Sequence, residues 1–266
     1  MELVEAKRYR HTIEIDGEPG EIEVRPDSVK PRLRIRLKLG NHEKLLEVVE
    51  RVRRMFDLGA DPSPIASHLS RSPRLNPLVA ARPGLRVPGV WDGFEFAVLT
   101  VLNIQLTARD HKTMVRHLVR TFGTPVKATA TGLSHLFPRP EQLAEADLSI
   151  VGIRGGCAKA VRSLARAVLK GELTFERSKR LEDTLSRLST VRGLGERECH
   201  YIAMRVFGEP DALPLYDHAL RQAVSAKSFE VYPVELERIA EPWRPWRAYA
   251  AMHLWIAAEA GARHQA

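Results

Sequence analysis

Val191-Arg192-Gly193-Leu194-Gly195-Glu196 is the stretch that decides the fold, because it joins two helical patterns through a Gly-x-Gly turn. Glycine tolerates positive φ and lets a neighbouring backbone approach closely. The helix that follows starts with unpaired N–H groups and a positive dipole end, which can face a phosphate without reading a base. An ordinary helix–helix turn would look the same, so the rest of the chain has to separate the two interpretations.

About twenty residues further on, Leu213-Pro214-Leu215-Tyr216-Asp217 leads into another helical pattern. Asp217 stands where an N-cap is expected, so capping is the neutral interpretation. Catalysis is compatible with capping, because N–H groups and the dipole at a helix start favour an ionised carboxylate. An ionised Asp can stabilise a sugar cation and orient a water molecule. A phosphate-binding turn followed by one acid therefore suggests chemistry on a nucleotide.

Length and composition narrow the possibilities. The chain has 266 residues, enough for a large core in two or three subdomains, and its 41 Lys and Arg against 33 acidic residues favour an anionic partner, nucleic acid first. The two cysteines, Cys157 and Cys199, predict no disulfide framework. No apolar run reaches the length of a membrane span, about 18 residues, and the first residues lack a signal-peptide pattern. We therefore expect a soluble cytoplasmic protein.

The N-terminal region has strand patterns. Residues 11–15 and 21–25 flank a turn over 16–20, and residues 30–39 alternate apolar and basic side chains. The cations of this third strand share one face, which either contacts DNA or is solvated, and the solvated face is the preferred interpretation. Helical spacing over 41–57 predicts a helix that covers the sheet. Proline-rich residues 59–92 are predicted to be a connecting region.

From residue 93 onward, apolar residues recur at helical spacing. The predicted fold is mainly α with a small antiparallel β N-terminal domain (α+β). We expect three parts: residues 1–58 form a sheet plus a helix, residues 93–213 a helical subdomain with the Gly-x-Gly turn, and residues 59–92 with 214–266 a helical subdomain that carries Asp217. The predicted helices are 93–107, 109–122, 140–147, 156–170, 177–190, 196–207, 217–226, 233–240 and 244–260.

This order of features resembles the helix-hairpin-helix DNA glycosylase superfamily and, within it, the bacterial 3-methyladenine DNA glycosylase II (AlkA) family. The resemblance runs from about Tyr9 to the C-terminus. Its most specific segments are residues 81–89 with 92–95, then 193–195, 213–217 and 243–255. Relative to that family, the N-terminal domain is expected to be truncated.

The resemblance implies a monofunctional glycosylase that flips a damaged nucleotide out of double-stranded DNA and hydrolyses the N-glycosidic bond of an alkylated base, 3-methyladenine above all. Asp217 would be the catalytic residue. The implied pocket residues are Tyr201, Trp255 and His218, although core packing explains Trp255 equally well. The implied DNA contacts are Gly193, Leu194, Gly195 and Arg197 at the hairpin, with Gln105 as the wedge that fills the vacated stack.

Two further expectations concern chemistry that the chain lacks. In the strand-cleaving branch of the superfamily a lysine forms a Schiff base at the position of Arg197, whose guanidinium cannot act as that amine. Two cysteines cannot supply the four ligands of the iron–sulfur branch. No cofactor is required, and the resemblance implies a monovalent cation on the carbonyls of Ser189, Val191 and Leu194. We expect no membrane contact and no obligate protein partner.

Two alternatives stay open. The same fold can act on deaminated or oxidised bases, or the chain is a non-catalytic helix-hairpin-helix DNA-binding module. A binding module does not need Asp217. The variant Asp217→Asn therefore separates the two classes, because it should lose base release in an enzyme and keep duplex binding in either case.

Overall fold

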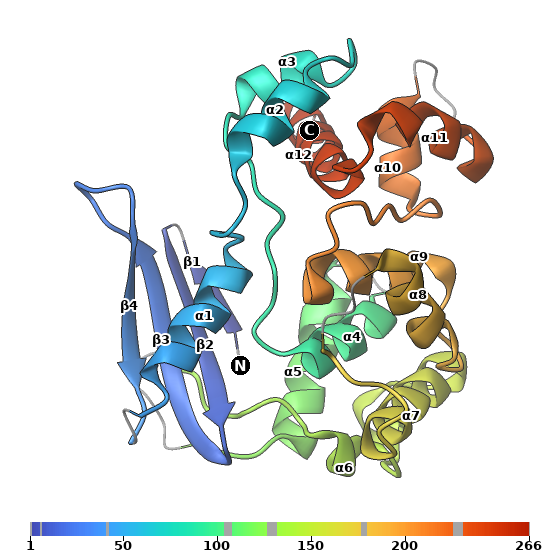
Figure 1. The fold of residues 1–266 in the computed structure, drawn as a ribbon. Coiled ribbons are helices and arrows are strands. Elements are labelled where there is room, and N and C mark those ends of the chain that lie inside the picture. Colours follow the sequence, from blue (N-terminus) through green and yellow to red (C-terminus); the bar gives the residue numbers. More distant parts are fainter. Residues whose placement is uncertain are drawn as a thin grey trace. The chain divides into compact units, whose positions relative to one another are not determined.

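The computed structural model in Figure 1 describes residues 2–5, 7–40, 43–103, 108–126, 132–176, 180–225 and 231–265, without the side chains of 108–110 and 261–265. The chain divides into two compact units, Met1–Glu50 with Leu102–Leu169 and Arg51–Val101 with Lys170–Ala266. The three-part division expected from the sequence stays a prediction. Across the described residues, no helix combines the length and the apolar character that crossing a membrane requires.

The first unit begins with a four-stranded antiparallel sheet in the order β1-β2-β3-β4. Its strands are β1 (Glu2–Glu5), β2 (Arg8–Ile15), β3 (Glu18–Pro26) and β4 (Leu33–Lys38). The turn between β2 and β3 is only Asp16-Gly17, both at positive φ, so Pro19 and Gly20 belong to β3 and not to the turn that the sequence predicted. Asp-Gly alone supplies the two positive φ angles that a two-residue hairpin needs. Strand β1 was not predicted, because four residues carry too little alternation.

The alternation predicted for β4 is confirmed. Arg34, Arg36 and Lys38 are exposed, whereas the intervening apolar residues are half-buried. The apolar face continues over the neighbouring strands as the buried residues Ile13, Ile15, Ile22 and Val24. A period of two along each strand therefore separates a core face from a charged face.

The rest of the first unit is helical. It contains α5 (Ala108–Phe122), α6 (Pro140–Leu143), the short 3-10 helix η1 (Leu148–Val151) and α7 (Gly155–Leu169), in which α6 packs on α7 and α5 on η1. The loop before α6 is joined to the sheet, since the Thr12 hydroxyl donates to the His135 carbonyl at 2.7 Å and Arg139 pairs with Glu14. Helices α1 (Leu45–Met55) and α4 (Gly93–Leu102) continue from one unit into the other.

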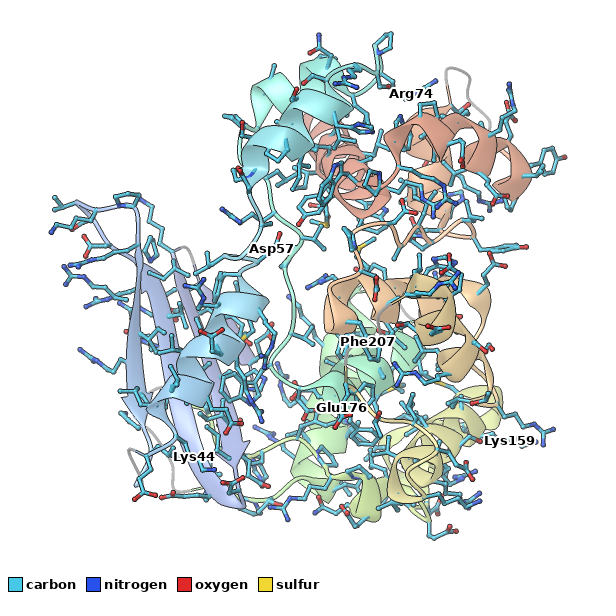
Figure 2. All side chains as sticks on the ribbon, viewed as in Figure 1. Lys44, Asp57, Arg74, Lys159, Glu176 and Phe207 are labelled. Atoms are coloured by element: carbon cyan, nitrogen blue, oxygen red, sulfur yellow. The ribbon has the colours of Figure 1, made fainter. Side chains whose placement is uncertain are left out.

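The second unit is all helical and carries the predicted site. Its remaining elements are α2 (Pro62–Leu69), α3 (Asn76–Ala81), α8 (Leu181–Ser189), α9 (Glu196–Ile202), the π-helical turn η2 (Ala203–Phe207), α10 (His218–Val224), α11 (Pro233–Ala240), η3 (Glu241–Trp243) and α12 (Arg247–Gln265). Helix α12 packs on α10 and α3 around a core that includes Trp243, Tyr249 and Leu254. The Tyr249 hydroxyl donates to Asp57, labelled in Figure 2, at 2.7 Å.

The interpretation of residues 59–92 as a connecting region is wrong in part, because α2 and α3 lie within it. The prolines of this region predict irregular structure. In both helices, however, a proline occupies the first turn, where the missing N–H has no intrahelical partner in any case. Asp61 caps α2 by accepting a hydrogen bond from the Ser63 N–H at 2.9 Å. Proline here starts helices.

Candidate active site

Asp217 is the N-cap of α10, as the sequence predicted. Its Oδ1 accepts hydrogen bonds from the Leu220 N–H at 2.8 Å and from the Trp255 indole Nε1 at 2.9 Å. Among the described residues these two groups are the donors to the Asp217 side chain, and both bond to the same oxygen. The carboxylate is half-buried, so its Oδ2 atom can serve a molecule from outside the protein.

Three aromatic side chains in successive contact begin at Asp217: Trp255, Tyr201 and Phe96. We call this row of rings the aromatic wall. Trp255 and Tyr201 meet edge to face with ring centroids 5.7 Å apart, and Tyr201 stacks on Phe96 at 5.8 Å with 17° between the planes. The rings come from α12, α9 and α4, and each is half-buried. The structure thus brings Asp217, Tyr201 and Trp255 together, and it adds Phe96.

Phe96 is a residue that the sequence reasoning missed. Phe94 and Phe96 both lie in the first turn of α4, and Phe94 is 6% exposed while Phe96 remains half-buried. Aromatic residues in an apolar helix are most often core, so Phe96 carried no local signal of its own. Its role becomes visible only through its stacking on Tyr201.

A protein cation lies on the same wall. The Arg205 guanidinium carbon is 5.2 Å from the Phe96 ring centroid and 6.0 Å from that of Tyr201, within cation–π range. Arg205 also donates from Nε to the Pro88 carbonyl. Tyr201 and Arg205, four residues apart, share a face although the helix changes to a π turn at Ala203.

The loop that leads to Asp217 is fixed by side chains from two helices. Arg247 on α12, 5% exposed, donates to both Asp211 carboxylate oxygens, at 2.8 and 2.9 Å. His200 on α9 accepts the Leu213 N–H at Nδ1, at 3.2 Å. Burial, together with the charge of Arg247, lowers the pKa of His200 to about 4, so the ring stays neutral and Nδ1 remains an acceptor at neutral pH.

The Gly-x-Gly turn has the expected hairpin conformation between α8 and α9. Gly193 has φ +98°, a conformation that L side chains rarely adopt. The N–H of Leu194 donates to the Val191 carbonyl at 3.1 Å. That carbonyl keeps a second lone pair, which fits the predicted cation on Ser189, Val191 and Leu194. The cation itself stays a prediction.

Glu198 closes the start of α9. Its Oε2 accepts the Gly195 N–H at 3.1 Å and its Oε1 pairs with Arg197 Nε at 2.8 Å. A Cβ at position 195 would lie only 2.7 Å from Glu198 Oε2, so glycine gives this carboxylate its space. The predicted DNA contact Arg197 is therefore held beside the hairpin by an ion pair.

Two predicted site residues are not placed in this cluster. His218 directly follows Asp217, and its side chain is exposed on α10. Gln105, the expected wedge, lies outside the described residues. Their roles stay predictions.

Comparison with known proteins supports the resemblance. Residues 1–92 match the AlkA N-terminal domain. A probable bifunctional transcriptional activator/DNA repair enzyme AlkA of Mycobacterium tuberculosis is 32% identical over 251 residues, which is 94% of this chain and 50% of that protein. DNA-3-methyladenine glycosylase 2 of Escherichia coli is 29% identical over 258 residues, 96% of this chain and 87% of that protein. The chain thus spans about half the length of the Mycobacterium tuberculosis relative.

Solved structures agree on the fold. A 3-methyladenine DNA-glycosylase from Archaeoglobus fulgidus superposes with a TM-score of 0.80 at 18% identity, covering 97% of this chain and 89% of that one. An 8-oxoguanine glycosylase/lyase from Clostridium acetobutylicum, in complex with DNA, gives a TM-score of 0.73 at 17% identity and covers 98% of both chains. The resemblance inferred from the sequence is confirmed: the chain has the helix-hairpin-helix DNA glycosylase fold, and its residues 1–92 match the AlkA N-terminal domain.

Proposed function

We propose that this chain is a monofunctional DNA glycosylase that hydrolyses the N-glycosidic bond of alkylated bases, of the 3-methyladenine type, in double-stranded DNA. The observation that carries the proposal is the Asp217 carboxylate, which two donors hold by one oxygen at the end of the aromatic wall. The curated relative from Escherichia coli, which is named for 3-methyladenine, supports the substrate class.

The aromatic wall suits a base that has left the DNA stack. Extrusion costs a few kcal/mol, least for a damaged base, and ring faces replace part of the lost stacking. A positively charged alkylated purine gains roughly 0.5–2 kcal/mol from a good cation–π contact. Tyr201, Trp255 and Phe96 are the described rings that can provide it.

Asp217 would act on the sugar. As the glycosidic bond breaks, its electron pair moves to the base, and a cationic alkylated base leaves as a neutral molecule. Positive charge then develops on the deoxyribose, where a carboxylate stabilises it. Water adds to the sugar carbon, and Asp217 can orient that water and accept its proton. One acid suffices, unlike in the two-carboxylate glycosidases, because this leaving group needs no protonation.

The monofunctional assignment depends on Arg197. Strand cleavage through a Schiff base requires an amine that loses its proton, and a guanidinium does not. No cofactor enters this reaction, and DNA is the proposed partner. We also propose a cytoplasmic location, which the two free cysteines, Cys157 and Cys199, support.

The decisive experiment is a base-release assay with Asp217→Asn. The amide oxygen of Asn can still accept from Leu220 and Trp255, so the fold is retained while the charge is lost. Duplexes with methylated, deaminated or oxidised bases are incubated with the parent and the variant, and the freed base is quantified by chromatography. We expect a loss of about 10²–10⁴-fold in the release of methylated bases, with duplex affinity unchanged.

A matched control is Asp61→Asn, which changes the cap of α2 in the same way. This control should release bases at the parental rate. Parental activity of Asp217→Asn would contradict the proposed mechanism. If the parent released only deaminated or oxidised bases, the substrate class would change. If the parent released no base at all, the chain would be a non-catalytic DNA-binding module.

A further inference from the structure

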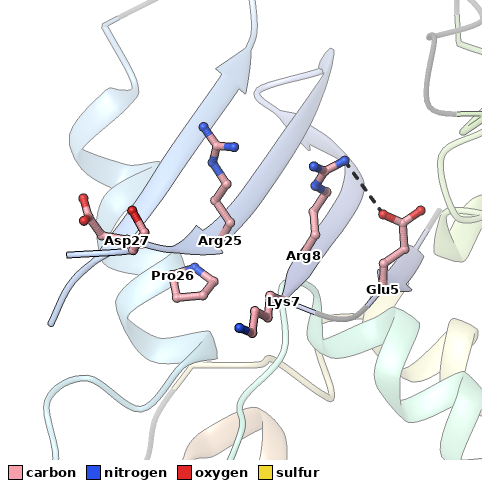
Figure 3. A pocket seen from close by; sticks show the side chains of 7 residues that line it. Glu5, Lys7, Arg8, Arg25, Pro26 and Asp27 are labelled. Carbon is pink, nitrogen blue, oxygen red and sulfur yellow. Dashed lines mark ion pairs between the residues drawn. The ribbon is translucent and has the colours of Figure 1, made fainter. Parts of the chain in front are cut away.

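A pocket of about 650 Å³ opens in the first unit, at the end of the sheet where Lys7 lies next to Pro26, the last residue of β3 (Figure 3). Its lining contains three cations, Lys7, Arg8 and Arg25. Figure 3 shows Arg8 and Arg25 extending in the same direction from neighbouring strands. The remaining lining residues are Glu5, Pro26, Asp27 and Ser28.

Asp27 does not neutralise these cations, because its acceptor sites are used elsewhere. Its side chain is 1% exposed. Oδ1 accepts the N–H groups of Val29 and Lys30 at 2.9 and 3.1 Å, and Oδ2 pairs with Arg32 and Arg34 at 3.0 and 2.6 Å. The Val29 N–H and the Arg34 guanidinium hold the pKa of Asp27 well below its usual range, so it stays a compensated anion.

The other carboxylate, Glu5, makes only loose pairs. It lies 3.9 Å from Arg8 and 3.9 Å from Arg10, with about half of its side chain exposed. Exposed pairs of this kind contribute about 0–1 kcal/mol. Arg8 also lies 3.7 Å from Glu23, whose short ion pair, at 2.8 Å, is with Arg10. Neither pair of Arg8 is close, so its guanidinium can turn to a stronger anion.

Arg25 and Lys7 carry the uncompensated charge. Within the described part of the chain, neither has a carboxylate partner, and both are exposed. Arg25 stands directly opposite Arg34 on β4. Asp27 pairs with Arg34 and leaves Arg25 without a carboxylate of its own, so a bound anion would meet an uncompensated guanidinium here.

The backbone conformation of Lys7 also indicates a ligand site. Lys7, in the connection between β1 and β2, has φ +67°. The corresponding turn between β2 and β3 has Asp16-Gly17, residue types that suit positive φ. A lysine there costs about 1–2 kcal/mol, and such conformations concentrate at ligand sites.

We propose that the pocket of Lys7, Arg8 and Arg25 binds a phosphate group, supplied by the DNA backbone outside the lesion. A guanidinium matches two phosphate oxygens at once and an ammonium adds a mobile point charge, so this donor set suits a phosphate well. The DNA source rests on the proposed function, whereas the phosphate chemistry does not. The AlkA N-terminal domain thereby contributes to DNA binding and is not only a scaffold.

The test uses Lys7→Asn/Arg25→Gln. Asn suits positive φ, so the turn should fold at least as well as in the parent. The control is Arg154→Gln/Lys159→Gln, which removes two exposed cations from the same unit. Arg154 directly precedes α7 and Lys159 lies within it (Lys159 is labelled in Figure 2). Affinity for an undamaged duplex is measured by fluorescence anisotropy from 50 to 200 mM salt. Losing one phosphate contact lowers the slope of log affinity against log salt by about 0.9 in magnitude.

A second arm titrates inorganic phosphate against chloride at equal ionic strength and follows the melting temperature. The proposal expects phosphate to stabilise the parent and the control, but not the pocket variant, and the duplex slope to fall in the pocket variant alone. Loss of phosphate stabilisation with a parental duplex slope would overturn DNA as the source in favour of a small phosphate ligand. Equal behaviour of the pocket and control variants in both arms would overturn the site. Base release plays no part in either arm, so failure of the glycosylase proposal would be seen separately.

Discussion

Trp255→Phe isolates the hydrogen bond that orients Asp217. The substitution removes the indole Nε1–H, which donates to Oδ1 at 2.9 Å, and keeps a ring next to Tyr201. The Leu220 N–H still caps the carboxylate at 2.8 Å, so α10 keeps its N-cap. The side chain of Asp217 then has one fixed donor where it had two, and it can rotate about that bond.

The magnitude follows from the charge of the acceptor. A hydrogen bond to a charged group contributes about 1.5–3 kcal/mol. If the hydrogen bond contributes this free energy in the transition state, by holding the carboxylate at the sugar, its loss lowers the excision rate by about 10- to 100-fold, since 1.4 kcal/mol corresponds to a factor of ten. Asp217 is only half-buried and water replaces the lost donor, so the free energy of unfolding should change by no more than about 1 kcal/mol.

Single-turnover excision at saturating enzyme measures the chemical step, and anisotropy with the same duplex measures binding. Trp246→Phe is the matched control, because Trp246 is also half-buried and meets Tyr249 edge to face at 5.8 Å. We expect the rate to fall for Trp255→Phe alone, with the duplex affinities of both variants close to that of the parent. A Trp255→Phe enzyme that excises within twofold of the parent would refute the role of this hydrogen bond.

Three other predictions follow from the same unit. Phe96→Leu should reduce the release of a cationic methylated base by about 2- to 30-fold relative to a neutral deaminated base, measured in the panel assay, and an unchanged ratio would remove Phe96 from the site. Arg247→Met leaves Asp211 with only the more exposed Arg244 as its charged partner and should lower the free energy of unfolding in urea by about 1.5–3 kcal/mol, the contribution of hydrogen bonds to a charged group. The His200 contribution to stability should be fully present above pH 6.5 and fall by up to ~3 kcal/mol as the pH drops toward 4, because unfolding exposes His200 to protonation. Burial also lowers the pKa of His253, which adds to the loss, so His200→Gln should make the pH profile of stability shallower.

Much of the fold could be predicted because its signals are local. The alternation of β4 is found as predicted, and the turn predicted over 16–20 is found in the shorter form Asp16-Gly17. The short strand β1 and the helices α2 and α3 escaped prediction. Four residues give too little period, and a proline in the first turn of a helix looks the same in sequence as one in a loop.

The site was predictable only where a residue carries its own signal. Asp217 has one, since a helix start with an acid can be recognised from the sequence. Phe96 and Arg205 have none, because the aromatic wall is assembled from α4, α9 and α12, which are far apart in the chain. Local periodicity states which face of a helix is apolar. It does not state which other helix that face meets.

Asp217 shows why a neutral interpretation and a functional one need not compete. Capping uses one acceptor site on Oδ1 and orientation by Trp255 uses another, whereas an ionised carboxylate offers about four such sites. At a helix start, one carboxylate can therefore cap the helix and take part in catalysis, because the two roles use different acceptor sites. Capping alone predicts that Asn at 217 is almost silent, while catalysis predicts a folded and inactive protein, so this single change separates the two roles that the sequence superimposes.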